Sequence, residues 1–524
     1  MPYKRVESIV RVRKTLQRSD KSEIINELAR RKGFFFPSYE IYGGVSGFVT
    51  FGPLGTVLKR RIEDKFREFY LRPLGILEIE SSVILPSKVF EASGHIENFK
   101  EPLVECTKCK RKFRADHLLR EQVGMTDTET EKLNLEELGK EIQNRGIKCP
   151  DCGGNFGEAK YFLTMFATTI GPYSDAVGYG RPEAAQSIFV EFRRLLDYAR
   201  ERLPFGVVQI GHALRNEISP RQGPIRLREF TIMDVEFFFD PENHDCPQLK
   251  SVEDETLRLL RAEAKLRDEK EPITVTVKQA LQEGYIKSEW QAFFMAQAKR
   301  FLRELGVPDE KQRFIEKLDW ERAHYSRQSF DQEIYLERWG WTEVSGHAYR
   351  TDYDLKRHME FSGVDMQAFK EGRRFIPHVV EPSFGSDRLV YIVIEHAYQT
   401  RDKRTVLSFP RDLAPVQVGV YPLVSKDGLP EKAKEVYQML IKKGFVAEYD
   451  ESGSVGRRYA RADESGTPLG ITIDYDTLKD ETVTIRDRDS WNQVRTEIKL
   501  LPTLLHAYFR FEKNFEDLGR LVKG

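Results

Sequence analysis

Arginines and carboxylates are dense in the stretch GHALRNEISPRQGPIRLREFTIMDVE, residues 211–236. The SPRQGP in its middle is a turn signal, so the stretch is predicted to form a hairpin of two strands. Successive side chains of a strand point to opposite faces of the sheet. One face of the second arm is therefore expected to present Arg226, Arg228, Phe230, Ile232, Asp234 and Glu236. The other face, with Met233, Val235 and Phe237, is more apolar and is expected to pack on a core.

This combination of side chains suits a nucleotide that lies beside an amino acid. Arginine binds phosphate through two parallel hydrogen bonds, an aromatic ring can cover a nucleobase, and carboxylates accept hydrogen bonds from an ammonium group or an exocyclic amine. On the first arm, Arg215 and Glu217 also share a face. The alternative is a solvent-exposed hairpin whose charges form salt bridges and bind no ligand.

Four of the five cysteines form two C-x-x-C pairs, Cys106 with Cys109 and Cys149 with Cys152. Two such pairs supply the four thiolates of a tetrahedral structural zinc site. The long gap between Cys109 and Cys149 requires an inserted helix to loop out. A catalytic zinc is not expected, because all four coordination positions would be filled. The alternative is a set of reduced thiols without metal, and the unpaired Cys246 is expected to be inert.

The chain has 524 residues, which is too long for one core and predicts three or four domains. Lysine plus arginine equal aspartate plus glutamate at 83 each, so bulk charge gives no support for nucleic-acid binding. A nucleic-acid partner would need local basic patches. Charged residues make up 32% of the chain, which is compatible with ion-pair networks.

No apolar run reaches the length of a membrane span, and no signal-peptide core is present. The N-terminal residues 1–20 are rich in arginine and lysine, but Glu7 argues against a cleaved targeting signal. A cytoplasmic protein without a membrane partner is therefore expected.

Three strings resemble the signature motifs of class II aminoacyl-tRNA synthetases. RNE followed by RLREF, with Arg215, Glu217, Arg226 and Phe230, is similar to the second motif. GSDRLVYIVI with Arg388 resembles the third, and ILEIESSVILP, which ends at Pro86, resembles the first. GYGRPEAAQSIFVEF, HVVEPSFGSDR and RTDYDLKRH are further similar to the glycyl-tRNA synthetase family of the homodimeric archaeal and eukaryotic-like type. The resemblance covers nearly the whole chain except residues 241–325.

The resemblance implies an α+β fold, with an antiparallel sheet flanked by helices as its core. The core is expected in three pieces with two insertions and a last domain: 1–100 (first motif), 101–160 (zinc-binding insertion), 161–240 (second motif), 241–325 (helical insertion), 326–410 (third motif) and 411–524 (α/β anticodon-binding domain). The string GSVGRRYARADESGTPLGITID resembles such an anticodon-binding domain. Arg457 and Arg458 are expected in a glycine-bearing loop of this domain and are its candidate tRNA contacts. The alternative for them is a solvated turn.

The resemblance also implies the reaction. ATP with Mg²⁺ converts glycine to glycyl-adenylate, the glycyl group then passes to the 3′ end of tRNA(Gly), and the enzyme is a homodimer. Arg215 and Arg388 are the implied catalytic residues, and Glu343 is the implied magnesium ligand. The implied ATP-binding residues are Arg215, Asn216, Glu217, Arg226, Arg228, Phe230, Glu343, Val344, Gly385 and Arg388.

Glycine offers no side chain to bind, so the implied pocket must hold its ammonium and carboxylate groups and exclude anything larger. The implied glycine-binding residues are Arg114, Glu183, Asp234, Glu236, Arg350, Glu381 and Ser383. The carboxylates are expected to accept from the ammonium group, and Arg350 is expected to hold the carboxylate. One methylene group alone discriminates by only about 1–3 kcal/mol.

Two alternatives remain open from the sequence. The first is another class II synthetase, for serine, threonine or proline, against which RPEAAQ and EPSFG count. The second is a non-catalytic nucleic-acid-binding relative with the same fold. Such a relative would be expected to lose the groups that hold ATP, whereas Arg215, Phe230 and Arg388 are all present.

Overall fold

The structure is a computed structural model that describes residues 21–126, 129–130, 132–172, 176–218, 220 and 223–522. The basic N-terminal stretch, on which the expectation about a targeting signal depends, lies outside the described residues. Part of the SPRQGP turn does so as well. Within the described residues, no helix is long and apolar enough to cross a membrane.

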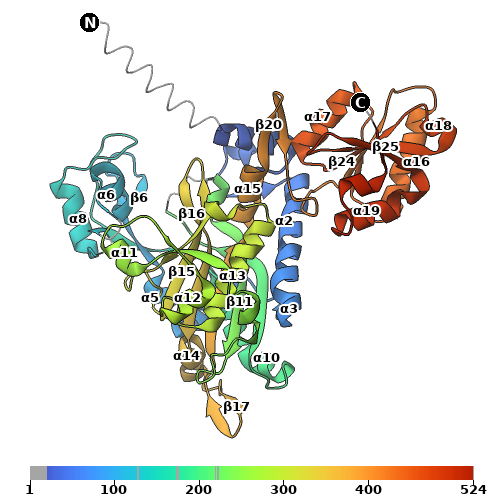
Figure 1. Ribbon diagram of the computed structural model, residues 1–524. Coiled ribbons are helices and arrows are strands. Elements are labelled where there is room, and N and C mark those ends of the chain that lie inside the picture. Colours follow the sequence, from blue (N-terminus) through green and yellow to red (C-terminus); the bar gives the residue numbers. More distant parts are fainter. Residues whose placement is uncertain are drawn as a thin grey trace.

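A nine-stranded sheet forms the centre of the molecule (Figure 1). Its order is β13 (Ile273–Thr276), β12 (Thr256–Leu260), β14 (Gln312–Glu316), β15 (Gln328–Leu336), β16 (Gly340–Thr351), β19 (His378–Gly385), β11 (Glu229–Phe239), β10 (Phe205–Leu214) and β3 (Leu77–Ile79). All neighbours are antiparallel except β12 with β14 and β10 with β3. The expected antiparallel sheet of an α+β fold is confirmed.

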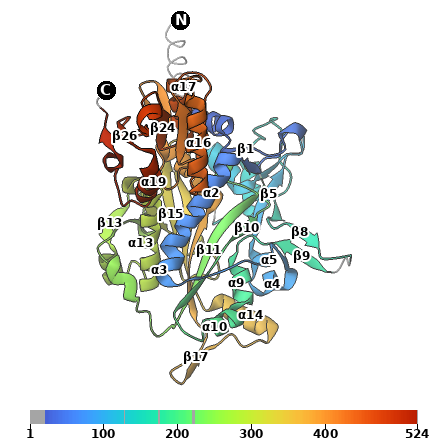
Figure 2. The same ribbon diagram turned by 90° about the vertical axis from the view of Figure 1, so that its right-hand side faces the viewer.

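Helices cover both faces of this sheet (Figure 2). One face carries α2 (Pro53–Phe66), α13 (Glu289–Glu304) and α15 (Ser386–Ala397), which share the largest hydrophobic core with the sheet. The other face carries α9 (Ala185–Val190), α10 (Phe192–Tyr198) and α14 (Tyr353–Ser362) around a smaller core. The helix α15 is buried on nearly every side, as its apolar sequence predicts.

The central strand β11 shows how the two faces separate apolar from polar side chains. Met233, Val235 and Phe237 point into the core formed with α2, α13 and α15. Asp234 and Glu236 point to the opposite face and are also fully buried. The predicted alternation of the hairpin is therefore confirmed in β11. The face of β11 that carries Asp234 and Glu236 is not exposed to bulk water, because α9 and α14 cover it.

Residues 241–325 differ from the expected helical insertion. They contribute β12, β13 and β14 to the central sheet, together with α11 (Ala262–Leu266), α12 (Val277–Gln282) and α13. Trp290 and Phe294 of α13 pack against Phe237 of β11. The segment is polar in sequence because one side of each element faces solvent. Its strands pair with residues distant in the sequence, and no local pattern shows such pairing.

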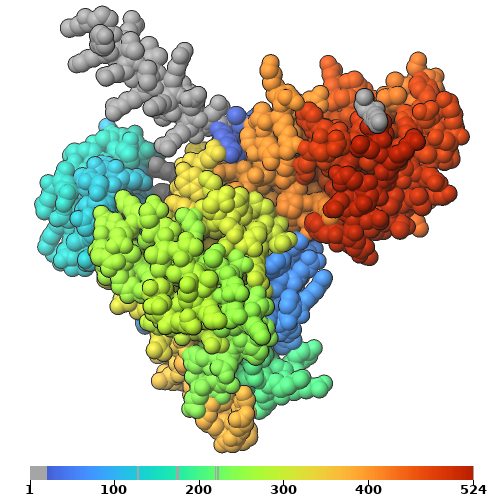
Figure 3. Space-filling model, in the orientation of Figure 1, coloured from blue at the N-terminus to red at the C-terminus, as the bar shows by residue number. Residues whose placement is uncertain are grey.

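The cysteine-bearing segment forms a small module of its own, which projects to one side of the body (Figure 3). It contains a three-stranded sheet, β6 (Lys112–Arg114), β5 (Lys100–Glu105) and β7 (Lys160–Leu163), with α6 (Ala115–Val123) and α8 (Leu135–Asn144). A separate hydrophobic cluster lies inside it. The capping box at Asn134 begins α8, the helix predicted to loop out between the cysteine pairs.

A second small sheet and several hairpins complete the body. The strand ending at Pro86 is split into β3 of the main sheet and β4 (Ile84–Pro86), which pairs with β9 (Val177–Gly180) and then β8 (Ala167–Thr169). The remaining elements of the body are β1 (Phe35–Pro37), β2 (Val49–Phe51), α3 (Arg72–Leu74), α4 (Ser87–Ala92), α5 (His95–Asn98), β17 (Ala368–Lys370), β18 (Arg373–Phe375), β20 (Tyr398–Arg401) and β21 (Arg404–Leu407).

The C-terminal domain projects on the side opposite the cysteine-bearing module (Figure 3). Its six-stranded sheet has the order β23 (Ala447–Tyr449), β22 (Val418–Pro422), β24 (Leu469–Ile473), β25 (Thr482–Asp487), β26 (Gln493–Glu497) and β27 (Arg520–Leu521). The helices are α16 (Leu429–Lys442), α17 (Val455–Ser465), α18 (Thr477–Asp480) and α19 (Leu501–Phe509). The predicted small α/β domain is present, with its own core.

Candidate active site

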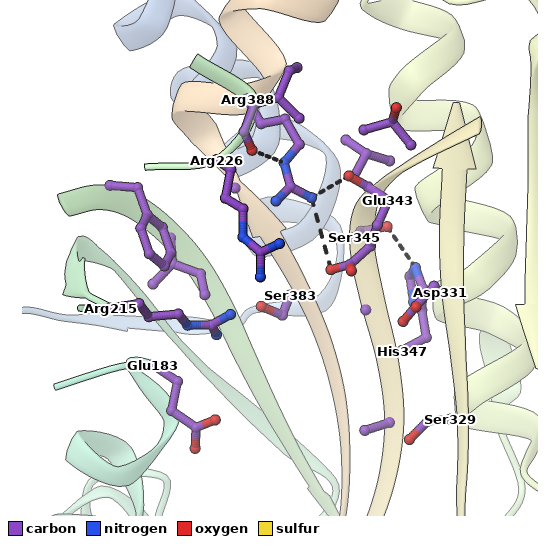
Figure 4. A pocket seen from close by; sticks show the side chains of 18 of the residues that line it. Glu183, Arg215, Arg226, Ser329, Asp331, Glu343, Ser345, His347, Ser383 and Arg388 are labelled. Carbon is purple, nitrogen blue, oxygen red and sulfur yellow. Dashed lines mark hydrogen bonds and ion pairs between the residues drawn. The ribbon is translucent and has the colours of Figure 1, made fainter. Parts of the chain in front are cut away.

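A cavity of about 630 Å³ opens over the polar face of the central sheet, between β11, β15, β16 and β19 (Figure 4). Eight of the ten predicted ATP-binding residues line it, namely Arg215, Glu217, Arg226, Phe230, Glu343, Val344, Gly385 and Arg388. Three of the predicted glycine-binding residues, Glu183, Glu381 and Ser383, line it as well. Residues far apart in the sequence therefore meet at one site.

Arg215 reaches into this cavity from the end of β10 (Figure 4). Its Nε donates to the carbonyl of Pro182 over 3.0 Å, and its guanidinium lies over the Phe230 ring at 5.4 Å. Among the hydrogen bonds of the described residues, neither Nη group has a protein acceptor. The side chain is thus held at its inner end and can offer two donors to an anion in the cavity.

Arg388, at the start of α15, enters the same space from the top of the view in Figure 4. Its Nε donates to the carbonyl of Ile225 over 3.0 Å, and one Nη donates to the carbonyl of Glu343. The Glu343 carboxylate lies 3.9 Å from the same Nη. Arg226 is anchored by Glu217 at 2.9 Å. Three guanidinium groups therefore surround one cavity, which favours a polyanion.

Two predicted ATP-binding residues lie outside the cavity lining. The Nη groups of Arg228 donate to the backbone carbonyls of Glu217 and Ser46, so this side chain holds the hairpin turn to the segment before β2. Asn216 pairs through its backbone with Thr164 at 2.7 Å. Alternation along β11 placed Arg228 on the ligand face, but the strand begins only at Glu229.

Buried carboxylates are concentrated at the deep end of the cavity. Asp234, Glu236 and Glu381 lie on adjacent strands β11 and β19, Glu183 precedes α9, and Asp354 lies in α14. Asp234 accepts from the backbone N–H of Ala184 over 2.7 Å and from the Ser383 hydroxyl. Gln186 donates to both Glu183 and Asp354, at 3.2 and 2.8 Å. The cluster is a strongly acidic pocket floor, suited to an ammonium group.

Arg350 differs from its expected role as the ligand of the glycine carboxylate. It is completely buried, and its guanidinium donates to Asp354 at 2.8 Å, to Glu381 at 2.9 Å and to Glu183 at 3.4 Å. The Tyr325 ring covers it at 3.6 Å. Since protein carboxylates occupy its donors, Arg350 orients Glu183 and Glu381 and does not line the cavity.

Burial shifts the charge states of the acidic cluster. It raises the pKa of Asp234 to about 6 and that of Glu381 to about 8, the latter despite the neighbouring Arg350. Burial also opposes ionisation of Glu183, but His95, whose Nε2 lies 3.2 Å away, and Arg350 outweigh it and lower the pKa of that carboxyl. Of these three carboxyl groups, Glu183 is therefore the one whose charged form is favoured.

Arg114 lies apart from the cluster. It forms ion pairs with Glu101 and with Asp116, the latter at 2.7 Å, at the junction between the cysteine-bearing module and the hairpin. Glu101 in turn lies 4.0 Å from Arg226. In this structure Arg114 therefore connects the module to the mouth of the cavity and makes no contact with the acidic floor.

The structure adds site residues that the sequence pattern did not reveal. Asp331 of β15 lines the cavity, pairs with Lys317 at 2.5 Å, and has its pKa raised to about 7 by burial and by Glu343. Tyr325 and His95 contact the acidic cluster. Asp331 sits in an ordinary alternating strand, and only the pairing of β15 with β16 brings it to Glu343.

The four cysteines of the two C-x-x-C pairs meet in one cluster, with every pair of sulfur atoms within 4.8 Å. The Sγ atoms of Cys106 and Cys152 lie 3.5 Å apart, and those of Cys109 and Cys149 lie 3.7 Å apart. Tetrahedral zinc with bonds of about 2.3 Å separates its sulfurs by about 3.8 Å. A side chain at Gly154 would collide with Cys106 Sγ at 2.9 Å. The cluster can hold a metal ion of this kind.

The two arginines predicted to contact tRNA differ in their exposure to solvent. Arg457 is exposed on α17, whereas Arg458 is 1% exposed and donates to the carbonyls of Pro422, Glu451 and Gly453. Both lie in a helix and not in the expected glycine-bearing loop. Arg458 therefore supports the domain from inside and is not available to RNA. Burial raises the pKa of the Cys246 thiol to about 12, in agreement with an inert residue.

Comparison with known proteins gives a consistent result. The anticodon binding domain family matches residues 417–507. A glycine–tRNA ligase of Aeropyrum pernix is 45% identical, over 96% of this chain and 99% of the relative. Those of Pyrococcus furiosus and Methanocaldococcus jannaschii are 43% and 42% identical, over 93% and 91% of this chain and 98% and 97% of the relatives.

Proposed function

The chain belongs to the glycine–tRNA ligase family, and from this premise we infer how its cavity activates glycine and charges tRNA. The protein is an aminoacyl-tRNA ligase that attaches glycine to tRNA. The observation that carries the assignment of the site is the meeting of three guanidinium groups and an acidic floor in one cavity. The cations suit the phosphates of ATP, and the floor suits the ammonium group of an amino acid.

In the first step, a glycine carboxylate oxygen attacks the α-phosphorus of ATP and pyrophosphate leaves. No side chain need remove a proton, because the nucleophile is already a carboxylate. Negative charge grows on the phosphate oxygens, so fixed donors aimed there contribute most to the rate. We assign this role to the free Nη groups of Arg215, with Arg388 and Arg226 toward the remaining phosphates. Phe230 supports the adenine ring and Glu217 accepts from its amine.

Glycine is held by the acidic floor. Glu183, Glu381 and Ser383 line the cavity, and Arg350 orients both glutamates from behind. We propose that the charged Glu183 is the first partner of the ammonium group. A larger amino acid would have to displace side chains that are held by hydrogen bonds and ion pairs to Arg350, Gln186 and Asp354. Larger amino acids are therefore excluded by steric clash with these fixed side chains.

Two metal sites belong to this proposal. Glu343 with the neighbouring Asp331 would hold Mg²⁺, which would supply positive charge to offset the phosphates of ATP. The Cys106, Cys109, Cys149 and Cys152 cluster would hold one structural zinc ion, because four thiolates leave no open position.

We also propose a homodimer that works in the cytoplasm, where translation takes place. The strand β4 and its neighbour β9 expose apolar side chains, with Ile84 41% and Val177 36% accessible. Light scattering on the purified protein tests this part, and a single monomeric species would contradict it.

Pyrophosphate exchange into ATP tests the activation step, with glycine, alanine and serine offered separately. Exchange with glycine alone supports the acidic floor as the amino-acid site. Exchange with serine would favour another class II specificity. Absence of exchange and of tRNA charging by the folded, zinc-loaded protein would favour a non-catalytic relative with the same fold.

A further inference from the structure

Glu236 is a buried carboxyl group that no part of the reaction described above uses. Its side chain is 0% exposed, and neither oxygen has a hydrogen-bond partner among the described residues. It does not belong to the lining of the cavity but lies behind it. An ionised carboxylate in such a position is strongly disfavoured, because nothing replaces the water it has lost.

The strand register places Glu236 next to Glu381. The pairs Asp234 with Ser383 and Phe237 with Val380 flank it, so Glu236 stands opposite Glu381 in the antiparallel ladder. Directly opposed residues in such a ladder point to the same face. Two carboxyl groups so close together cannot both ionise easily in a buried place, and they share protons as a pair.

The surroundings of Glu236 contain more negative than positive charge. Five acidic side chains meet here: Asp234 and Glu236 from β11, Glu381 from β19, Asp354 from α14 and Glu183 before α9. Three guanidinium groups face them, that of Arg350 from β16 and those of Arg181 and Arg215 on the side of Asp234. On β10 the residue opposite Glu236 is the apolar Val207. His358 and His95 face the cluster from its edge, and burial lowers the pKa of His358. Protons or an added cation must offset the excess.

We propose that Glu236 and Glu381 share one proton while the amino-acid site is empty, and that the ammonium group of the substrate displaces this proton when it binds. Glu236 is thus a positioning residue that acts through Glu381. Before substrate binds, the shared proton reduces the electrostatic repulsion among the carboxyl groups of the acidic floor. The incoming –NH₃⁺ supplies the positive charge instead, and the proton leaves to solvent, so charge is balanced before and after binding.

The inference rests on the proposed function, because the displacing cation is the ammonium group of glycine. It has a consequence for affinity. Binding that releases a proton becomes tighter as the pH rises, by up to about tenfold per pH unit across the range in which the pair titrates. Burial and the opposing charge raise the pKa of both members of the pair, that of Glu381 to about 8, so this range lies above the ordinary range of carboxyl groups.

Isothermal titration calorimetry with 5′-O-(glycylsulfamoyl)adenosine, in buffers of different ionisation enthalpy, counts the protons released. The wild type is expected to release close to one proton per site near pH 7. Glu236→Gln keeps shape and burial but has no proton to share, so it should bind with the release lost and the affinity independent of pH. Subtracting the variant also removes any proton that the ligand itself exchanges.

A matched control is Glu395→Gln, a buried glutamate of α15 that accepts from the Glu337 N–H over 2.8 Å, away from the cavity. It should release as many protons as the wild type. Wild-type binding without proton release, or equal release by Glu236→Gln, would overturn the inference. A wild type that does not bind the analogue at all would instead count against the proposed function.

Should Glu236→Gln fail to fold, infrared difference spectroscopy on the wild type gives the same answer. The C=O stretch of a neutral carboxyl group should disappear when the analogue binds. An unchanged neutral-carboxyl band would overturn the proposal.

Discussion

Arg350 and Glu381 form a buried ion pair in which Nη1 lies 2.9 Å from Oε2 and the arginine has no exposed surface. The same guanidinium donates to Asp354, four residues on, across the junction between β16 and α14. One cation thus supports the acidic floor from behind, and the guanidinium groups that face the cavity come from the hairpin and from α15. Replacement of Arg350 and replacement of an arginine that faces the cavity are therefore expected to have different effects.

Replacing Arg350 with methionine should loosen the site as a whole. Removing one partner of a buried ion pair costs about 3–5 kcal/mol, because the other charges stay buried without compensation. We expect faster hydrogen–deuterium exchange in β16 and β19 and a large rise in the KM for glycine. Arg194→Met is the control, since that side chain is 84% exposed and pairs with Glu191 at the surface. Wild-type exchange rates in R350M would contradict the bracing role.

Replacing Arg215 with alanine should act on the chemical step. Loss of a donor that faces the developing charge is expected to lower kcat in pyrophosphate exchange by about 10²- to 10³-fold. Arg228→Ala should mainly raise the KM for ATP, because Arg228 donates only to backbone carbonyls that hold the hairpin turn. The reverse order, with kcat more sensitive to Arg228, would show that the assignment of these two arginines is wrong.

Replacing Cys149 with serine should remove the metal. The wild-type chain is expected to contain one zinc ion by mass spectrometry of metals, and the variant should contain close to none, with the cysteine-bearing module unfolding at a lower temperature. Cys246→Ser should keep full zinc content, since Cys246 is alone and its thiol is buried. A wild type without zinc after purification in zinc-containing buffer would contradict this site.

Arg457 and Arg458 should separate in their effects although they are neighbours. Arg457→Ala removes an exposed cation, so it should raise the KM for tRNA and reduce its salt dependence by a slope of roughly 0.7–0.9. Pyrophosphate exchange should not change. Arg458→Ala leaves three backbone carbonyls without their buried donor and should lower the melting temperature of the C-terminal domain. Equal loss of stability in both variants would contradict the assignment.

The empty protein should lose stability as the pH rises from about 4 to 8. The folded pKa values of Asp234, about 6, and Glu381, about 8, lie above the ordinary values, so folding holds protons that the unfolded chain releases at higher pH. Glu183 has the opposite sign, because its pKa is lowered, and its contribution is lost only on acidification. The glycyl-adenylate analogue should therefore raise the melting temperature more at pH 8 than at pH 6. A smaller gain at pH 8 would contradict this.

Local features of the chain could be predicted from the sequence without the structure. The alternation along β11, the buried helix after Gly385 and the two C-x-x-C pairs depend on residues within one element or one turn, so their chemistry is visible as a pattern. The resemblance of the three motif strings pointed to the family, and the relatives of 42–45% identity confirm it. Of the eight predicted ATP-binding residues that line the cavity, six lie in the second and third motif strings, and Glu343 and Val344 lie outside these strings.

Features that depend on pairing between distant segments could not be predicted from the sequence. The strands β12, β13 and β14 lie in a segment that looks polar in sequence. They join the central sheet through pairing, because β14 pairs with β15 and β12 pairs with both β14 and β13. Arg457 and Arg458 are neighbours of the same residue type, and only the packing of α17 on β22 buries Arg458. Asp331 becomes a site residue only when β15 is laid beside β16.

The sequence by itself thus determined the family, the reaction and eleven of the residues that line the cavity. The tertiary structure decided which charges face one another. It paired Arg350 with buried carboxylates, and it placed Glu236 opposite Glu381 without a hydrogen-bond partner among the described residues. The physical reason is that the charge state and the role of a buried polar group depend on neighbours brought together by folding, and these neighbours are distant along the chain.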